Sequence, residues 1–218
     1  MTQKFVESNY GNQTWCDLLE QAGCPVTHFS PVKIYPDEYI GGIVNAACKA
    51  LDVKPVLLLR ELGKFAAGEL INFANHMLHP SWKTFEVLSN VETLIHTTIK
   101  VQNADAQPAN IQAFRVGENE IEVVYTSRRG LCALAHGIIE GIAQHFDEDI
   151  TVDQITCTQD GQAFCTFSVR RNSSIQSDEN FFIAQLPESP SDSVKGHFNS
   201  ETVVADLDAI KSATIFDN

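Results

Sequence analysis

The spacing of hydrophobic residues changes from a helical period in the first half of this chain to short β-type runs in the second half. That change limits the folds that the chain can adopt. In the second half, short β-type runs predict two hairpins, one from residues 111–116 and 120–125 and one from residues 150–156 and 163–170. Gly117-Glu118-Asn119 is the predicted turn of the first hairpin. A run at helical spacing, residues 131–146, lies between the hairpins and offers an apolar face to the sheet.

The first half has a helical period. Apolar residues recur at helical spacing as far as Leu19, and again over residues 39–51, 56–77 and 82–100. Pro55 suits the first turn of the helix that begins there. The predicted fold is therefore α+β, with an N-terminal helical subdomain followed by a four-stranded antiparallel sheet with a packed helix.

Residues 1–171 and 172–218 differ in composition. Only the first segment has the apolar content that a full core requires. The second segment is rich in Ser, Asp, Asn and Pro as far as Ser200, which is typical of a linker or a loosely docked tail. Residues 201–216 are compatible with a short helix. We expect one domain, residues 1–171, followed by an acidic linker or tail, residues 172–218.

Acidic residues outnumber basic residues by 28 to 15 in this chain of 218 residues. Nucleic acids and anionic membrane surfaces both require a positive face on the protein, so neither is an expected partner. No basic segment followed by an apolar run stands at the N-terminus, and no apolar run approaches membrane-spanning length. The expected location is the cytoplasm.

Tyr125, Ser127 and Arg129 stand at alternate positions where an apolar strand leads into a helix. Residues two apart in a strand share a face, so two hydroxyls and a guanidinium can converge there. Such a group suits a ligand with two carboxylates, because Arg binds a carboxylate through paired hydrogen bonds. Haem, with its two propionates, is a ligand of this kind. For this short segment alone, a strand end with exposed polar residues is the simpler interpretation.

His96 borders the apolar stripe of the helix predicted over residues 82–100. A histidine in such a place is commonly a partly buried packing residue. A neutral imidazole is also a common axial ligand of haem iron. The candidate propionate ligands downstream favour this second role.

Several motifs, in this order and spacing, carry a family resemblance. Besides the segments around His96 and Tyr125, they are Tyr10-Gly11-Asn12-Gln13-Thr14-Trp15, Tyr35-Pro36-Asp37-Glu38-Tyr39, Leu59-Arg60-Glu61-Leu62-Gly63-Lys64-Phe65 and Gly137-Ile138-Ile139-Glu140-Gly141. With them, residues 3–170 resemble the H-NOX family, the haem nitric oxide/oxygen binding domains. The resemblance implies haem b as cofactor and His96 as its proximal iron ligand. It also implies that Tyr125, Ser127 and Arg129 bind the propionates.

Dioxygen-binding members of this family carry a distal tyrosine that donates a hydrogen bond to the bound gas. The matching position here is Leu134, and the neighbouring matched positions are Ala66 and Leu70. An apolar pocket does not stabilise the partly negative oxygen of bound dioxygen, whereas nitric oxide depends less on a donor. The resemblance thus implies a nitric oxide sensor, with carbon monoxide as a further ligand. The family's proline that presses on the macrocycle falls at Pro108 or Ala109.

The resemblance also implies a signalling mechanism. Nitric oxide would weaken the bond between the iron and His96, and the helix that carries His96 would shift for a partner to read. The implied partners are a histidine kinase or a cyclic-nucleotide enzyme. The chain has none of their catalytic motifs, so we do not expect it to be an enzyme.

Cys132, Cys157 and Cys165 fall on neighbouring predicted elements, where three thiolates would suit zinc. In relatives with a zinc site here, the fourth ligand is a histidine three residues before the second cysteine. Gln154 occupies that position in this chain. His136, one helical turn after Cys132, is another candidate for the fourth ligand. Two interpretations of these cysteines therefore remain: a zinc site with a redox role, or free thiols that can be oxidised.

Two other classes of function are compatible with parts of the chain. The cysteine-bearing hairpin after the Gly-Ile-Ile-Glu-Gly helix also resembles the 4-vinyl reductase type of domain, a haem-free module that would bind another small molecule and zinc. A structural interaction domain that works through its acidic tail is the other class. The helical half and His96 favour haem over both.

Overall fold

The computed structural model describes residues 1–29 and 33–172. In the described part the α-helices are α1 (Thr2–Tyr10), α2 (Asn12–Gln21), α3 (Asp37–Leu51), α4 (Pro55–Ala74), α5 (Thr84–Val91), α6 (Thr97–Gln102) and α7 (Cys132–His145). Short turns of other helix types are the 3-10 turns η1 (Asn75–Met77) and η3 (Thr158–Asp160) and the π-helical turn η2 (Glu92–His96). Pro55 stands in the first turn of α4, as predicted, where its missing N–H costs no helical hydrogen bond.

The sheet contains β1 (Asn110–Arg115), β2 (Glu120–Thr126), β3 (Ile150–Thr156) and β4 (Cys165–Arg171). Its order is β1-β2-β4-β3, and every neighbouring pair is antiparallel. Both hairpins form where the alternating runs predict them. The helical N-terminal part and the four-stranded antiparallel sheet confirm the predicted α+β fold.

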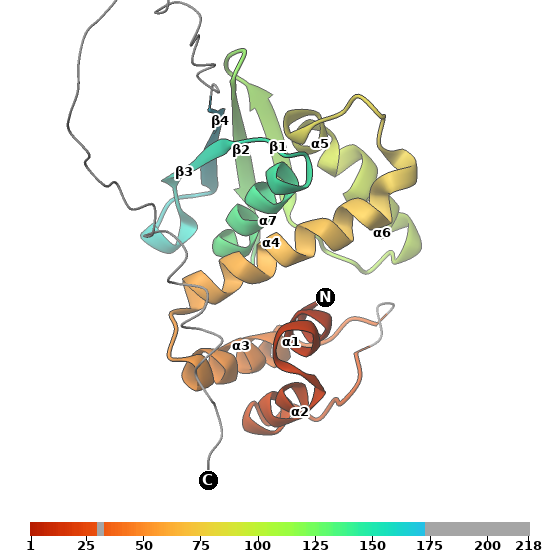
Figure 1. Ribbon diagram of the computed structural model, residues 1–218, viewed down its shortest axis with the longest axis vertical. Helices are drawn as coiled ribbons and strands as arrows, with labels where there is room; N and C mark the ends of the chain where they lie inside the picture. The colour runs from red at the N-terminus through yellow and green to blue at the C-terminus, as the bar shows by residue number, and fades with distance from the viewer. Residues whose placement is uncertain (30–32, 173–218) are drawn as a thin grey trace, which may run out of the picture. The chain divides into compact units, whose positions relative to one another are not determined.

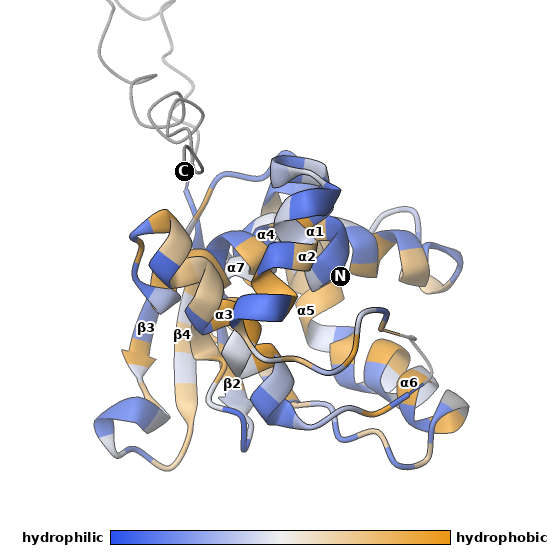
Figure 2. Cartoon of the chain, turned by 90° about the horizontal axis from the view of Figure 1, so that it is seen from below, coloured by the Kyte–Doolittle hydropathy of each residue, from blue (hydrophilic) through white to orange (hydrophobic). Residues whose placement is uncertain are grey.

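Helix α7 lies between α4 and the sheet (Figure 1). The main core fills the space between α7 and the sheet, and Phe85, Ile121, Phe167 and Val169 within it are completely buried. Hydrophobic and hydrophilic residues alternate in bands along the helices (Figure 2), so a helix can present an apolar side to a core and a polar side to solvent.

Glycines allow α4 and α7 to approach each other closely. A Cβ added to Gly137 would lie 1.9 Å from the carbonyl oxygen of Arg60, and one added to Gly63 would lie 2.3 Å from that of Leu134. One turn further along α7, a Cβ on Gly141 would meet the carbonyl oxygen of Lys64 at 2.6 Å. Backbone therefore packs against backbone along this crossing, which no larger residue would allow.

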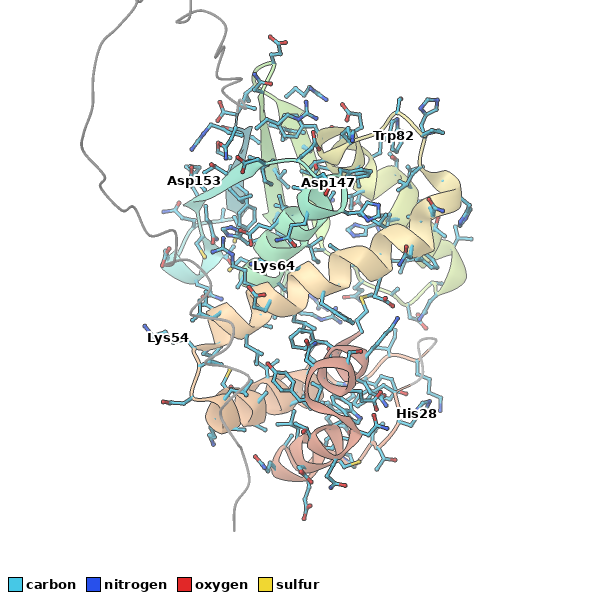
Figure 3. The ribbon with its side chains drawn as sticks, viewed as in Figure 1. His28, Lys54, Lys64, Trp82, Asp147 and Asp153 are labelled. Carbon is cyan, nitrogen blue, oxygen red and sulfur yellow. The ribbon has the colours of Figure 1, made fainter. Side chains whose placement is uncertain are left out.

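Helices α1, α2 and α3 enclose a second, smaller core around Trp15, Leu18 and Ile43. Polar residues lie on the outside, and His28 and Lys54 are exposed side chains of the helical half (Figure 3). The predicted tail, apart from residue 172, and the helix predicted over residues 201–216 lie outside the described residues. Within the described part, no helix combines the length and apolarity needed to cross a bilayer.

Candidate functional site

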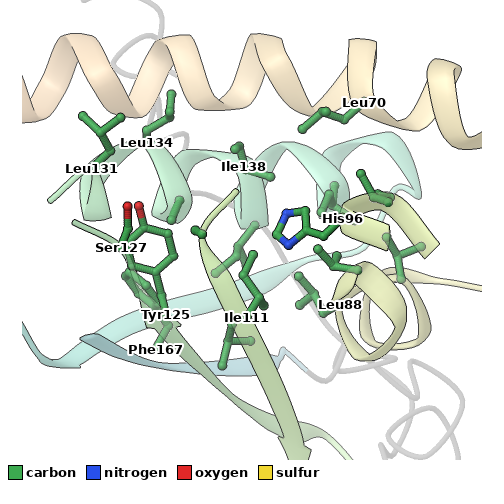
Figure 4. A pocket seen from close by; sticks show the side chains of 18 of the residues that line it. Leu70, Leu88, His96, Ile111, Tyr125, Ser127, Leu131, Leu134, Ile138 and Phe167 are labelled. Carbon is green, nitrogen blue, oxygen red and sulfur yellow. The ribbon is translucent and has the colours of Figure 1, made fainter. Parts of the chain in front are cut away.

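A cavity of about 230 Å³ lies between α7, the sheet and the segment α5–η2. Its walls are mainly aliphatic, and the polar side chains among its lining residues are His96, Tyr125, Ser127 and Arg129. Figure 4 shows the His96 ring at one end of the cavity and the hydroxyls of Tyr125 and Ser127 at the other. The fold thus brings the four polar residues singled out in the sequence to one cavity.

His96 is the last residue of the π-helical turn η2, and only 11% of its side chain is exposed. Its Nδ1 atom lies 2.8 Å from Glu92 Oε2, one turn earlier. Glu92 also accepts hydrogen bonds from Lys100 Nζ at 3.0 Å and from the backbone N–H of Ile111 at 3.4 Å. Burial alone would raise the pKa of the Glu92 carboxyl, but these three donors outweigh burial and lower it. Glu92 is therefore an ionised acceptor at neutral pH.

Tyr125 and Ser127 extend from the end of β2, two residues apart, and their side chains are hydrogen-bonded to each other. Burial raises the pKa of Tyr125, so its phenol keeps a proton to donate. Arg129 Nε donates to Asp37 Oδ1 at 2.7 Å, at the start of α3. Because this ion pair uses Nε, Asp37 does not engage the two terminal nitrogens, and these can meet a carboxylate.

The apolar wall of the cavity includes Leu134 and Leu70, two of the pocket residues expected from the resemblance. The other two predicted pocket residues are placed differently. Ala66 is buried in the core, 4% exposed, but does not line the cavity. Of the two candidate positions for the proline, Ala109 lines the cavity and Pro108 does not.

The three C-terminal cysteines form a cluster in which the sulfur atoms lie within 4.8 Å of one another. The Sγ atoms of Cys132 and Cys157 are 3.7 Å apart, too far for a disulfide bond. Tetrahedral zinc with Zn–S bonds of about 2.3 Å would separate its sulfurs by about 3.8 Å, which matches this spacing. The backbone N–H of Thr158 donates to Cys165 Sγ at 3.3 Å.

The thiols of the cluster differ in acidity. Burial, together with the hydrogen bond to Cys157, raises the pKa of Cys132 to about 11. Burial also tends to raise the pKa of Cys157, but the backbone N–H of Gln159 and the neighbouring thiols outweigh it and lower the value. Cys157 is thus more readily deprotonated than Cys132.

The structure does not bring His136 into this cysteine cluster. Its Nε2 atom lies 3.8 Å from Glu140 Oε1, its ring packs edge-on against Phe167, and Nε2 has no hydrogen-bond partner among the described residues. The β3–β4 turn reaches only the start of α7, where Gln159 Nε2 donates to the carbonyl oxygen of Gly130 at 3.0 Å. A residue one turn later, about 5.4 Å further along the helix, faces other neighbours. Gln154 instead contacts Cys132 by a side-chain hydrogen bond.

Sequence reasoning missed two residues of the cavity region. Glu92 carries a signal in its spacing, because a carboxylate four residues before a histidine shares its helix face. Asp37, which pairs with Arg129, is 92 residues away in the chain and has no such signal.

Fold and site together define a class: a helical and antiparallel-sheet domain with a cavity lined by an imidazole and by a group suited to carboxylates. The sequence profile of the Haem-NO-binding family matches residues 1–154. The chain belongs to this family of haem-based gas sensors, which are sensor domains and generally not enzymes. No curated protein sequence matches the chain.

Solved structures similar to this fold include H-NOX proteins. That of S. oneidensis in the Fe(II)NO ligation state has a TM-score of 0.73 and 21% identity, covering 78% of this chain and 95% of that one. The Fe(II) unliganded protein from K. algicida has a TM-score of 0.69 and 16% identity, with 78% and 92% covered. The I5F mutant from T. tengcongensis has a TM-score of 0.68 and 19% identity, with 79% and 94% covered.

The residues of the cavity fit the family's cofactor. With Nδ1 directed at Glu92, Nε2 of His96 is the nitrogen left for a metal. Tyr125, Ser127 and Arg129 supply hydroxyl and guanidinium donors for carboxylates, and the remaining walls suit a porphyrin because they are apolar. The family match favours haem over the haem-free module considered from the sequence.

Proposed function

We propose that this chain is a haem-based nitric oxide sensor that reports through the bond between the iron and His96. One observation carries the proposal: His96 lies at one end of an otherwise apolar cavity and the hydroxyls of Tyr125 and Ser127 lie at the other, and Arg129 also lines this cavity. Haem b has the matching polarity, with a metal at its centre and two carboxylates at one edge. When bound, it supplies the iron site for the gas.

Each polar residue has a distinct task in this proposal. His96 binds the iron through Nε2, while Tyr125 and Ser127 donate hydrogen bonds to the propionates. Arg129 adds a charge-assisted pair, which is shorter and stronger than a neutral hydrogen bond. Its contact with Asp37 at 2.7 Å also ties the helical subdomain to the propionate end of the cavity.

The wall of the cavity supports selectivity for nitric oxide. Leu134 and Leu70 present no hydrogen-bond donor, and a donor is what bound dioxygen needs. An H-NOX protein from S. oneidensis has been solved in both the Fe(II)NO and the Fe(II)CO ligation states. We therefore extend the proposal to carbon monoxide as a second ligand.

The segment that carries His96 is suited to movement. A π-helical turn, Glu92–His96, stands between α5 and α6, and such turns occur frequently at functional sites. Weakening of the bond to His96 would release η2 and α6, and a partner must bind the two arrangements with different affinity. We propose a histidine kinase or a cyclic-nucleotide enzyme as that partner.

Optical spectroscopy of the ferrous protein under anaerobic conditions tests the gas-sensing function. We expect a Soret band that shifts when nitric oxide is added, and no stable dioxygen complex in air. His96→Gly should abolish the proximal bond, whereas His28→Gly, at an exposed position, should leave the spectrum unchanged. A wild-type protein that stays colourless after reconstitution with haem would refute the proposal.

The cysteine cluster is a second candidate site, and we propose that it binds zinc. Cys132, Cys157 and Cys165 would supply three thiolates, and Gln154 or a solvent molecule would complete the set. Oxidation of the thiolates would release the metal and add a redox response. Zinc counted per chain before and after Cys165→Ala tests this, with Cys16→Ala at an exposed, isolated cysteine as the matched control. A count near zero in the wild type would exclude the site.

A further inference from the structure

The side of His96 that faces away from the cavity is held by a carboxylate. His96 Nδ1 and Glu92 Oε2 are 2.8 Å apart, within the range of a charge-assisted hydrogen bond. The His96 side chain is 11% exposed and that of Glu92 is 31% exposed, so the contact is partly shielded from water. An exposed helical pair of this spacing would contribute little. Here burial gives the contact more weight.

Glu92 is itself fixed in place. Its Oε1 atom lies 3.0 Å from Lys100 Nζ, two helical turns later. Its Oε2 atom also accepts from the backbone N–H of Ile111, the second residue of β1, at 3.4 Å. The carboxylate thus connects η2, α6 and the edge of the sheet, and these two further contacts help to hold it beside His96.

This geometry determines which imidazole nitrogen carries the proton. A carboxylate only accepts, so Nδ1 donates and Nε2 keeps its lone pair toward the cavity. An acceptor on the far nitrogen of a metal-bound histidine raises the basicity of the ligand and strengthens its bond to the metal. Lys100 forms an ion pair with Glu92 and so partly neutralises the charge that Glu92 presents to His96. This ion pair therefore reduces the strengthening of the bond to the metal.

We infer that Glu92 is a positioning residue that strengthens the link between His96 and the haem iron and so sets how readily nitric oxide breaks it. The inference rests on the proposed haem function and adds a regulator to it. Glu92 opposes release of His96, and Lys100 opposes Glu92. We therefore expect nitric oxide to release His96 less readily in this chain than in a variant without the Glu92 charge.

Resonance Raman spectroscopy of the ferrous protein, residues 1–218, without gas tests this through the iron–histidine stretching frequency. Glu92→Gln keeps the shape of the side chain but removes its charge, and it should lower the frequency. Lys100→Met removes the ion pair that partly neutralises Glu92, and it should raise the iron–histidine stretching frequency. Glu69→Gln, which removes an exposed ion pair with Lys4, is the matched control and should not change it.

Stopped-flow mixing with nitric oxide gives a second measurement. Loss of the His96 bond should become about tenfold faster in Glu92→Gln, since removal of a partner that orients a metal ligand typically costs 10- to 100-fold. The Lys100→Met variant should be slower than wild type. Lys100 is 49% exposed, so this variant keeps the test decisive even if Glu92→Gln does not retain haem.

Haem held by His96 with an unchanged stretching frequency in both variants would overturn the role of Glu92 and leave the proposed gas-sensing function standing. A wild-type protein without haem would overturn both.

Discussion

Replacing Gly137 with alanine is expected to destabilise the fold strongly, because α4 and α7 touch at this position. The added Cβ would lie 1.9 Å from the carbonyl oxygen of Arg60, while real Cβ contacts are essentially never shorter than 3.0 Å. The two helices would have to separate by roughly 1 Å, and close-packed interiors resist such shifts. The obstacle is backbone, so no side-chain rotation can relieve it.

The expected cost follows from that geometry. Overpacking that side chains can absorb costs about 1–3 kcal/mol, so a backbone clash should lower the free energy of unfolding by about 3 kcal/mol or more. For a domain of this size that corresponds to a fall in Tm of roughly 6–12 °C. Urea denaturation followed by circular dichroism measures the loss directly.

Gly68 in the same helix α4 supplies a matched control. A Cβ built there meets no atom within 4 Å. Gly68→Ala should therefore stabilise the protein by about 0.5–1 kcal/mol, because alanine loses less conformational entropy than glycine on entering a helix. The same glycine-to-alanine change should thus lower the free energy of unfolding at Gly137 and raise it at Gly68. Equal stability of Gly137→Ala and wild type would refute the close backbone contact between α4 and α7.

Three further predictions concern single side chains. Burial lowers the pKa of His136 below its usual 6.5, so the unfolded state binds more protons just below that pH and stability falls as the pH drops from 7.5 to 5.5; urea titrations at both pH values should show a smaller fall in His136→Gln, and an unchanged fall would argue against its burial. Glu148 accepts from the Thr84 backbone N–H at 2.8 Å and pairs with Arg171 at 2.8 Å, so Glu148→Ala should cost about 2–3 kcal/mol in chemical denaturation; a loss below about 0.5 kcal/mol would contradict this. Tyr125→Phe should speed haem transfer to an acceptor apoprotein about tenfold, through loss of one donor to a charged group; a transfer rate equal to that of wild type would show that the phenol does not hold a propionate.

The hydrophobic period alone predicted most of the local structure. Alternation over residues 111–116 and 120–125 and the turn at residues 117–119 are local properties, and β1 and β2 form there. The helical start at Pro55 is equally local, because proline tolerates the first turn and disrupts later ones. The strand order β1-β2-β4-β3 was not predictable from period, since it depends on which strands α7 covers.

In the candidate site, too, some features follow from local sequence spacing and others depend on tertiary packing. Tyr125 and Ser127 share a strand face by spacing alone, whereas their meeting with His96 across a cavity depends on how η2 packs against the sheet. The expected helical pairing of Cys132 with His136 was misleading, because the other two sulfurs approach only the start of α7. The role inferred for Glu92 depends on both levels: its spacing from His96 lies in the sequence, but the contact with Ile111 exists only once β1 has docked.

Short-range order is thus encoded residue by residue, because backbone preference and side-chain period act over a few positions. Residues distant in the chain meet in the cavity, in the cysteine cluster and in the contacts that hold Glu92 beside His96. The tertiary structure decided these features, because close packing in three dimensions selects which of many possible partners meet.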